Sequence, residues 1–197
     1  MQPVARRVVK VGGSLFACSE LAPALRAWLA EQSPATNILL AGGGALADVV
    51  RDWDARFQLG QARAHWLCVE VLRVTARLLT DLLPECRLVT DFGELRGALQ
   101  EPLDGRAVVF CPAQFLREVE ATLGLPPLPQ TWDVTSDSLA ARLAEALSAR
   151  ELVLLKSSDP PAAGLAGTDY VDEYFAEAAR NIPTVRFVNL RANRKPA

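Results

Sequence analysis

The sequence predicts an α/β protein, a three-layer αβα sandwich with a mainly parallel central sheet. Three observations support this class: short runs rich in Val, Ile and Leu recur along the chain, helical patterns separate them, and glycine-rich turns follow the first two. Strands that alternate with helices pair in parallel, and helices cover both faces of such a sheet. A chain of 197 residues that is 50% hydrophobic can bury one sizeable core, so we expect a single domain over residues 1–197.

The composition argues against several kinds of partner. A formal net charge of -2 and a pI near 5.5 leave no electrostatic footprint for nucleic acid. The four cysteines have no C-x-x-C spacing, so neither a zinc site nor a disulfide framework is suggested, and reduced thiols fit best. No apolar run has transmembrane length, and no signal-peptide pattern precedes the first strand. We therefore expect a cytoplasmic protein with no nucleic-acid or membrane partner.

The run Val8–Val11 predicts a buried strand that leads into Gly12 and Gly13. Glycines have no Cβ, so the N–H groups of such a loop can converge on one point and attract an anion. Lys10 adds a compact positive charge there, in a chain that otherwise prefers arginine. The alternative is that Lys10 is a strand-end side chain with its ammonium group in solvent.

The next elements continue the alternation of helix and strand. Leu21–Gln32 has helical spacing, Ile38–Ala41 predicts a second strand, and Gly42–Gly44 opens another helix. The run from Gly42 matches the G-x-G-x-x-A pattern of dinucleotide-binding proteins, which requires a strand with a terminal acid about twenty residues later. The chain continues instead as a helix from about Ala62 to Leu83, so the dinucleotide interpretation is weak.

Two side chains near the second glycine loop are candidates for anion binding. His65, the only histidine, falls in the first turn of the long helix, and Arg51 lies on the helix before it. An arginine near a glycine loop can hold two phosphate oxygens. A structural His65 packed beside Trp66 and a solvated Arg51 are the alternatives.

The later elements are shorter. Two buried strands are predicted at Cys86–Val89 and Ala107–Phe110, each followed by a turn and a helix. The proline-rich linker Leu125–Gln130 cannot continue a helix and is expected to cross the surface toward the site. A short helix over Asp172–Arg180 and a last strand at Thr184–Asn189 complete the chain.

A polar segment precedes the next predicted helix. Thr135, Ser136 and Asp137 fit ordinary capping of a first helical turn. The segment holds more hydroxyls and carboxylates than one cap requires, and these groups can also fix lysine side chains or contact a nucleotide and its Mg²⁺. The strand Leu152–Leu155 follows and ends at Lys156. Because ligands bind at the carboxyl edge of an open parallel sheet, we expect both glycine loops at that edge.

The order of these motifs resembles the amino-acid kinase superfamily, which has the aspartate, glutamate and uridylate kinase fold. The matching pieces are Lys10-Val11-Gly12-Gly13-Ser14, the Gly42–Gly44 loop, and Thr135-Ser136-Asp137-Ser138 before the strand that ends in Lys156, within about residues 5–159. The stretches Gly42–Asp48 and Ala64-His65-Trp66 most resemble the small kinases of methanogens and methylotrophs. Those kinases serve methanofuran-type cofactor synthesis and phosphorylate an aminomethylfuran-methyl phosphate.

The resemblance implies a phosphotransferase that uses ATP and Mg²⁺. It implies that Lys10 and Lys156 neutralise charge on the transferred phosphoryl group and that Asp137 orients them, which makes these three residues catalytic. It further implies nucleotide and phosphate binding by Gly12, Gly13, Ser14, Thr135, Ser136 and Ser157, and acceptor binding by Gly42, Gly43, Gly44, Arg51 and His65. No protein metal site is expected.

The C-terminal part departs from the family pattern. Relatives continue with an Asp-Gly-Val-Tyr-like turn, a second catalytic lysine and the adenine pocket, whereas Lys156 here precedes Ser157-Ser158-Asp159-Pro160-Pro161. Either Lys156 supplies the second charge or the nucleotide half has degenerated. The leading hypothesis is a homo-oligomeric kinase of a small phosphorylated acceptor. The alternatives are a kinase of another phosphate or carboxylate acceptor and a non-catalytic anion-binding, nucleotide-binding or storage protein.

Overall fold

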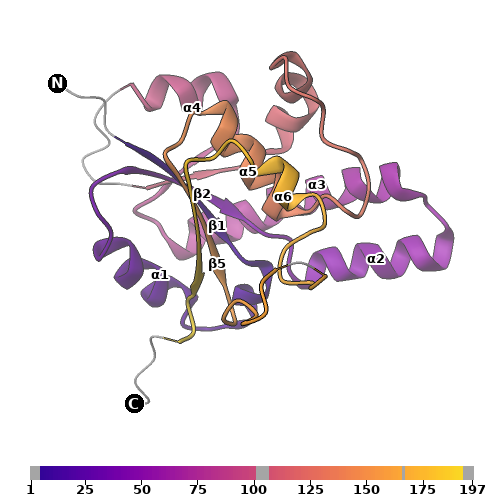
Figure 1. Cartoon of the computed structure of the whole chain (residues 1–197), viewed down its shortest axis with the longest axis horizontal. Coiled ribbons are helices and arrows are strands. Elements are labelled where there is room, and N and C mark those ends of the chain that lie inside the picture. Colours follow the sequence, from indigo (N-terminus) through magenta and orange to yellow (C-terminus); the bar gives the residue numbers. More distant parts are fainter. Residues whose placement is uncertain (1–4, 101–106, 166, 193–197) are drawn as a thin grey trace.

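The central sheet has six strands, all parallel, in the order β3-β4-β2-β1-β5-β6 (Figure 1). The computed structural model describes residues 5–100, 107–165 and 167–192, so both ends of the expected domain lie outside the described residues. Its strands are β1 Arg6–Val11, β2 Thr36–Ala41, β3 Arg87–Val89, β4 Val108–Phe110, β5 Glu151–Lys156 and β6 Thr184–Asn189. Its α-helices are α1 Leu21–Ala30, α2 Ala45–Phe57, α3 Gln61–Leu82, α4 Phe92–Ala98, α5 Ser136–Ala146 and α6 Phe175–Ala178.

The strand β1 lies at the centre of the sheet. It pairs with β2 on one side and with β5 on the other, and Lys10 lies opposite Leu40 and Leu154. The residues from Val8 to Val11 are buried, as expected for a strand covered on both faces. Because the three strands run in the same direction, the loops after them meet at one edge of the sheet.

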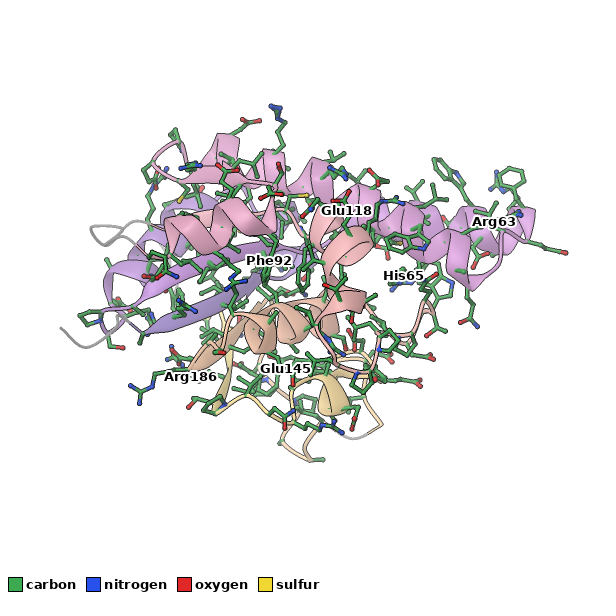
Figure 2. The ribbon with its side chains drawn as sticks, turned by 90° about the horizontal axis from the view of Figure 1, so that it is seen from above. Arg63, His65, Phe92, Glu118, Glu145 and Arg186 are labelled. Atoms are coloured by element: carbon green, nitrogen blue, oxygen red, sulfur yellow. The ribbon has the colours of Figure 1, made fainter. Side chains whose placement is uncertain are left out.

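Helices cover the sheet. The helix α5 packs against β1 and β5, and α3 packs against β2, β3 and β4. Figure 2 shows α2 and α3 along one side of the molecule and α5 and α6 along the other. This arrangement confirms the predicted αβα sandwich around a parallel sheet.

The helices α2 and α3 form a hairpin that extends away from the sheet (Figure 1). Gly60 forms the turn with a φ of 85°, a conformation that favours glycine, and its N–H donates to Asp54 Oδ1 at 2.9 Å. The residues predicted as helix from Ala62 to Leu83 correspond closely to α3. Within the described ranges, no helix combines the length and the hydropathy needed to cross a membrane.

One of the later predicted helices was wrong in extent. The helix predicted over Asp172–Arg180 is confined to α6, because Asp172 turns its carboxylate toward the start of α5 and the Tyr174 N–H donates to the Asp133 carbonyl. The helix predicted after β4 is present but irregular: residues 113–114 are α-helical, Phe115–Val119 form a π-helical turn and Glu120–Thr122 form a 3-10 turn.

Candidate active site

The two glycine loops contact each other at the carboxyl edge of the sheet. A Cβ on Gly13 would lie 2.2 Å from the Gly44 nitrogen, and a Cβ on Gly42 would lie 2.7 Å from the Gly13 nitrogen. Side chains at these positions would force the backbones apart, so the close approach requires glycine. The prediction that both loops lie at the same edge is confirmed.

A buried lysine and a partly buried one share one buried carboxylate beside these loops. Lys10 Nζ lies 2.8 Å from Asp137 Oδ1, and Lys156 Nζ lies 2.7 Å from Asp137 Oδ2. Only 5% of Lys10 and 4% of Asp137 are exposed. Two ammonium groups and one carboxylate leave one net positive charge, which favours a bound anion.

The three groups shift one another's ionisation. Burial by itself raises the pKa of a carboxyl, but the charges of Lys10 and Lys156 outweigh it and hold the pKa of Asp137 below its usual value. Burial and the charge of Lys10 lower the pKa of Lys156, against the attraction of Asp137. Asp137 is thus ionised at neutral pH and compensates both lysines.

The segment after β5 holds Lys156 in place. Lys156 Nζ donates to the Tyr170 carbonyl at 2.6 Å and lies 5.2 Å from the centre of the Tyr170 ring. At the end of β5, Ser157 Oγ lies 2.9 Å from Ser14 Oγ, which joins this strand end to the first glycine loop. The ammonium group of Lys156 therefore has a fixed position in the site.

The start of α5 is fixed by a carboxylate from a distant part of the chain. Asp172 accepts four hydrogen bonds, from the N–H and hydroxyl groups of both Thr135 and Ser138. Burial raises the pKa of Asp172, an effect that these hydrogen bonds oppose. The contacts hold the first turn of α5, and with it Asp137, against the two lysines.

A cavity of about 380 Å³ opens beside Lys10 and the glycine loops. Nine of the residues predicted from the sequence line this cavity: Lys10, Gly13, Ser14, Gly43, Gly44, Arg51, His65, Thr135 and Ser136. An apolar part of its wall comes from Cys68, Val69, Leu72, Val134 and Leu139. Burial raises the pKa of the Cys68 thiol to about 11, so that side chain is uncharged at neutral pH. The cavity thus combines anion-binding groups with an apolar wall.

His65 lies on the cavity wall but not at the helix start. Because α3 begins at Gln61, His65 lies in its second turn, which corrects the position predicted from the sequence. Figure 2 shows His65 where α3 faces the segment that precedes α5. Burial lowers the pKa of His65, against a contact with the Thr131 backbone, so the imidazole is neutral at pH 7.

A second, larger cavity of about 1210 Å³ adjoins the first. Asp137 lines it together with apolar side chains that include Phe175, Val185 and Phe187. Four residues line both cavities: Arg51, Trp132, Thr135 and Asp169. The Lys10–Asp137–Lys156 group thus lies where two binding spaces meet.

The structure brings all the predicted site residues together. Nine line the smaller cavity. Gly12 and Gly42 extend the sheet by one hydrogen bond each, because the Gly12 N–H donates to the Leu155 carbonyl and the Gly42 N–H donates to the Val11 carbonyl. The sequence analysis missed Asp172 and Tyr170, which fix the lysine–carboxylate group, and Trp132 and Asp169, which line both cavities. Within the described residues, no group of three or more His, Cys, Asp or Glu could hold a metal ion.

Paired glycine loops and two lysines on one carboxylate, at the carboxyl edge of a parallel sheet, are typical of α/β proteins that bind phosphate groups. The sequence model of the amino acid kinase family matches residues 5–160. The chain therefore belongs to the amino acid kinase family.

A curated relative is the [5-(aminomethyl)furan-3-yl]methyl phosphate kinase of Methanocaldococcus jannaschii, 24% identical over 153 residues. The match covers 77% of this chain and 66% of the relative, so this chain spans just under two thirds of that protein's length. The uridylate kinase of Archaeoglobus fulgidus has a similar structure, with a TM-score of 0.61, 19% identity and coverage of 91% of this chain and 88% of that one. The UMP kinase of Ureaplasma parvum gives a TM-score of 0.63, 11% identity and coverage of 94% and 90%. These two structures support the fold.

Proposed function

We propose that this protein transfers the γ-phosphoryl group of ATP to a small phosphorylated acceptor, and that the acceptor is aminomethylfuran-methyl phosphate. The observation that carries the proposal is the Lys10–Asp137–Lys156 group at the junction of two cavities. Anion binding alone would not require two lysines held by one buried carboxylate. The name of the methanogen relative supports the choice of acceptor. The whole chain would act as one domain in the cytoplasm, where ATP is available.

In the proposed reaction, an oxygen of the acceptor phosphate attacks the γ-phosphorus of ATP. The bond from that phosphorus to the β,γ-bridging oxygen breaks, and ADP leaves. Lys10 and Lys156 stabilise the charge on the transferred group, and the N–H groups of the glycine loops orient its oxygens. Asp137 keeps both ammonium groups in place.

The two cavities suit the two substrates of this reaction. The smaller one holds anion-binding groups and has room for a small acceptor. The larger one has apolar walls against which an adenine base could pack, and Asp137 at its border. The lysines between them would meet the phosphoryl group during transfer. This arrangement supports Lys156 as the source of the second positive charge.

Mg²⁺ fits this site as a companion of the nucleotide. The ion usually binds substrate phosphates, waters and one or two carboxylates, so a cluster of protein ligands is not required. Asp133, Asp169 and Glu173 line the larger cavity and could supply such a carboxylate, whereas Asp172 already binds the start of α5. When bound, Mg²⁺ would neutralise charge on the ATP phosphates.

A coupled assay for ADP tests the proposal. Purified protein with ATP and Mg²⁺ is expected to release ADP only when aminomethylfuran-methyl phosphate is added, and chelation of Mg²⁺ by EDTA should stop the release. UMP and acetylglutamate serve as alternative phosphate and carboxylate acceptors. ATP binding without ADP release for any acceptor would favour the non-catalytic alternative.

Replacing His65 by alanine tests the acceptor side of the site. If the imidazole donates a hydrogen bond to the acceptor phosphate, His65→Ala should raise the acceptor KM about ten- to a hundredfold and leave the ATP KM nearly unchanged. His65→Gln should recover part of this loss, because an amide can donate without a charge. Equal changes in both KM values with a lowered melting temperature would indicate a structural histidine.

We also propose that the protein forms a homo-oligomer through an apolar face on α2 and α3. Within the described residues, the exposed large hydrophobic side chains all lie on these helices: Leu46, Val49, Trp53, Phe57, Leu67, Val74, Leu78 and Leu82. Each of them is between 37% and 63% exposed, and a standard interface buries ~800 Å² on each partner. Exposed charged residues of both signs neighbour these side chains in the sequence, among them Arg56, Arg77 and Asp81. A face with charges of both signs suits a symmetric second copy of the chain better than a partner that is uniformly acidic or basic.

A change of charge on the apolar face tests the oligomer. The wild-type protein should have a solution mass at least twice that of the 21.3 kDa chain, and Phe57→Glu combined with Val74→Glu should reduce it to the single chain. The matched control is Ala121→Glu, an exposed position outside these two helices. Light scattering after gel filtration gives the masses. A monomeric wild-type protein would contradict the proposal.

A further inference from the structure

Trp132 lies in the wall between the two cavities. It lines both of them, together with Arg51, Thr135 and Asp169. On the side of the smaller cavity, its neighbours in the wall include Val134 and Leu139. An aromatic side chain therefore contributes to the apolar part of the acceptor space.

Two contacts fix the orientation of the Trp132 ring. Its indole N–H donates to Asp54 Oδ2 at 2.8 Å, and the other oxygen of Asp54 accepts the Gly60 N–H at the turn between α2 and α3. The Arg51 guanidinium lies 5.0 Å from the ring centre, and Arg51 is also bound to Asp48 at 2.8 Å. A ring held from two sides offers a preformed contact surface.

We propose that Trp132, held by Asp54 and Arg51, selects acceptors that carry a flat ring. This inference rests on the proposed function and adds the residue that recognises the non-reacting body of the acceptor. An aromatic ring placed between the apolar wall and Trp132 gains an aromatic pair contact that an open alkyl chain lacks. The phosphate of the same acceptor would be held by the glycine loops and His65. Trp132 is then a specificity residue and takes no part in the transfer.

Trp66 provides a matched comparison. Its indole N–H donates to Gln130 Oε1 at 3.0 Å, and the Arg117 guanidinium lies 4.5 Å from its ring centre. It thus has the same kind of support as Trp132 but lies outside the lining of both cavities. It contacts His65 edge to face, so a change at Trp66 that acts through His65 would affect every phosphorylated acceptor equally.

The test compares a ring acceptor with an alkyl acceptor of similar charge. The dissociation constants of aminomethylfuran-methyl phosphate and 5-aminopentyl phosphate, which carries the same ammonium and phosphate groups on an open chain, are measured by calorimetry, which does not require turnover, for the wild type, Trp132→Leu and Trp66→Leu. Trp132→Leu should weaken binding of the furan about two- to tenfold more than binding of the alkyl phosphate. Trp66→Leu should leave the ratio of the two constants unchanged. Trp132→Phe should retain part of the preference.

Three outcomes would overturn the inference. Equal weakening of both acceptors in Trp132→Leu would mean that the ring is not recognised there. Weaker ATP binding with an unchanged acceptor ratio would assign Trp132 to the nucleotide. A wild-type protein that binds no ring acceptor would contradict the inference directly. If the wild type binds the furan without releasing ADP, the proposed transfer fails while the effect of Trp132 on binding is still measured.

Discussion

Replacing Lys10 by alanine should lower kcat by a factor on the order of 10² or more, because the lost charge acts mostly in the transition state. Lys10 is almost fully buried and lies 2.8 Å from Asp137. The ATP KM and acceptor KM should change much less than kcat. Steady-state kinetics on the purified variant, with both substrates varied, gives the three values.

The control for this experiment is Lys10→Arg. The guanidinium keeps the charge but is broader and directs its donors differently, so it should restore activity only in part. A circular dichroism melt separates loss of catalysis from loss of folding. An unchanged kcat in a well-folded Lys10→Ala protein would remove Lys10 from the catalytic site.

Replacing Asp137 by asparagine should have the largest effect on stability. The change leaves the buried ammonium group of Lys10 and the partly buried one of Lys156 without their counter-charge, which costs about 3–5 kcal/mol of the free energy of unfolding. The stabilisation from Asp137 should be present above the usual carboxyl pKa and disappear as the pH falls through its lowered pKa. Denaturant unfolding at several pH values measures both the loss and its pH dependence.

The difference in the free energy of unfolding between the wild type and Asp137→Asn should become smaller at alkaline pH. Lys156 already has a lowered pKa, so in Asp137→Asn it can lose its proton and with it the unpaired charge. Asp159→Asn, at an exposed position just after β5, is the matched control and should change stability by less than about 0.5 kcal/mol. Equal stability of Asp137→Asn and the wild type at neutral pH would contradict the buried ion group.

The glycine loops and lysines at the carboxyl edge of the sheet could be predicted because local sequence patterns mark them. A β-branched run that ends in Lys10 and two glycines specifies a buried strand and a loop of N–H groups, whatever packs around it. Parallel pairing then brings the carboxyl ends of β1, β2 and β5 to one edge. The position of Lys156 follows from the same rule.

The remaining parts of the site depend on contacts between distant segments. Asp172 lies 34 to 37 residues after the residues that it binds at the start of α5, and Asp54 lies 78 residues before Trp132. No local sequence pattern therefore marks either carboxylate. The charge of His65 depends on its burial, which a sequence window does not contain. The predicted helix at Asp172 was too long for the same reason, because this tertiary contact overrides local helical spacing.

The most direct test of phosphoryl transfer is a ³¹P NMR time course of the wild-type protein with ATP, Mg²⁺ and aminomethylfuran-methyl phosphate. Transfer to the acceptor phosphate forms a diphosphate, so two coupled resonances of the product should grow as ADP appears and as the acceptor resonance declines. Unchanged ATP and acceptor, or ATP converted to ADP and free phosphate with the acceptor intact, would contradict the proposed kinase.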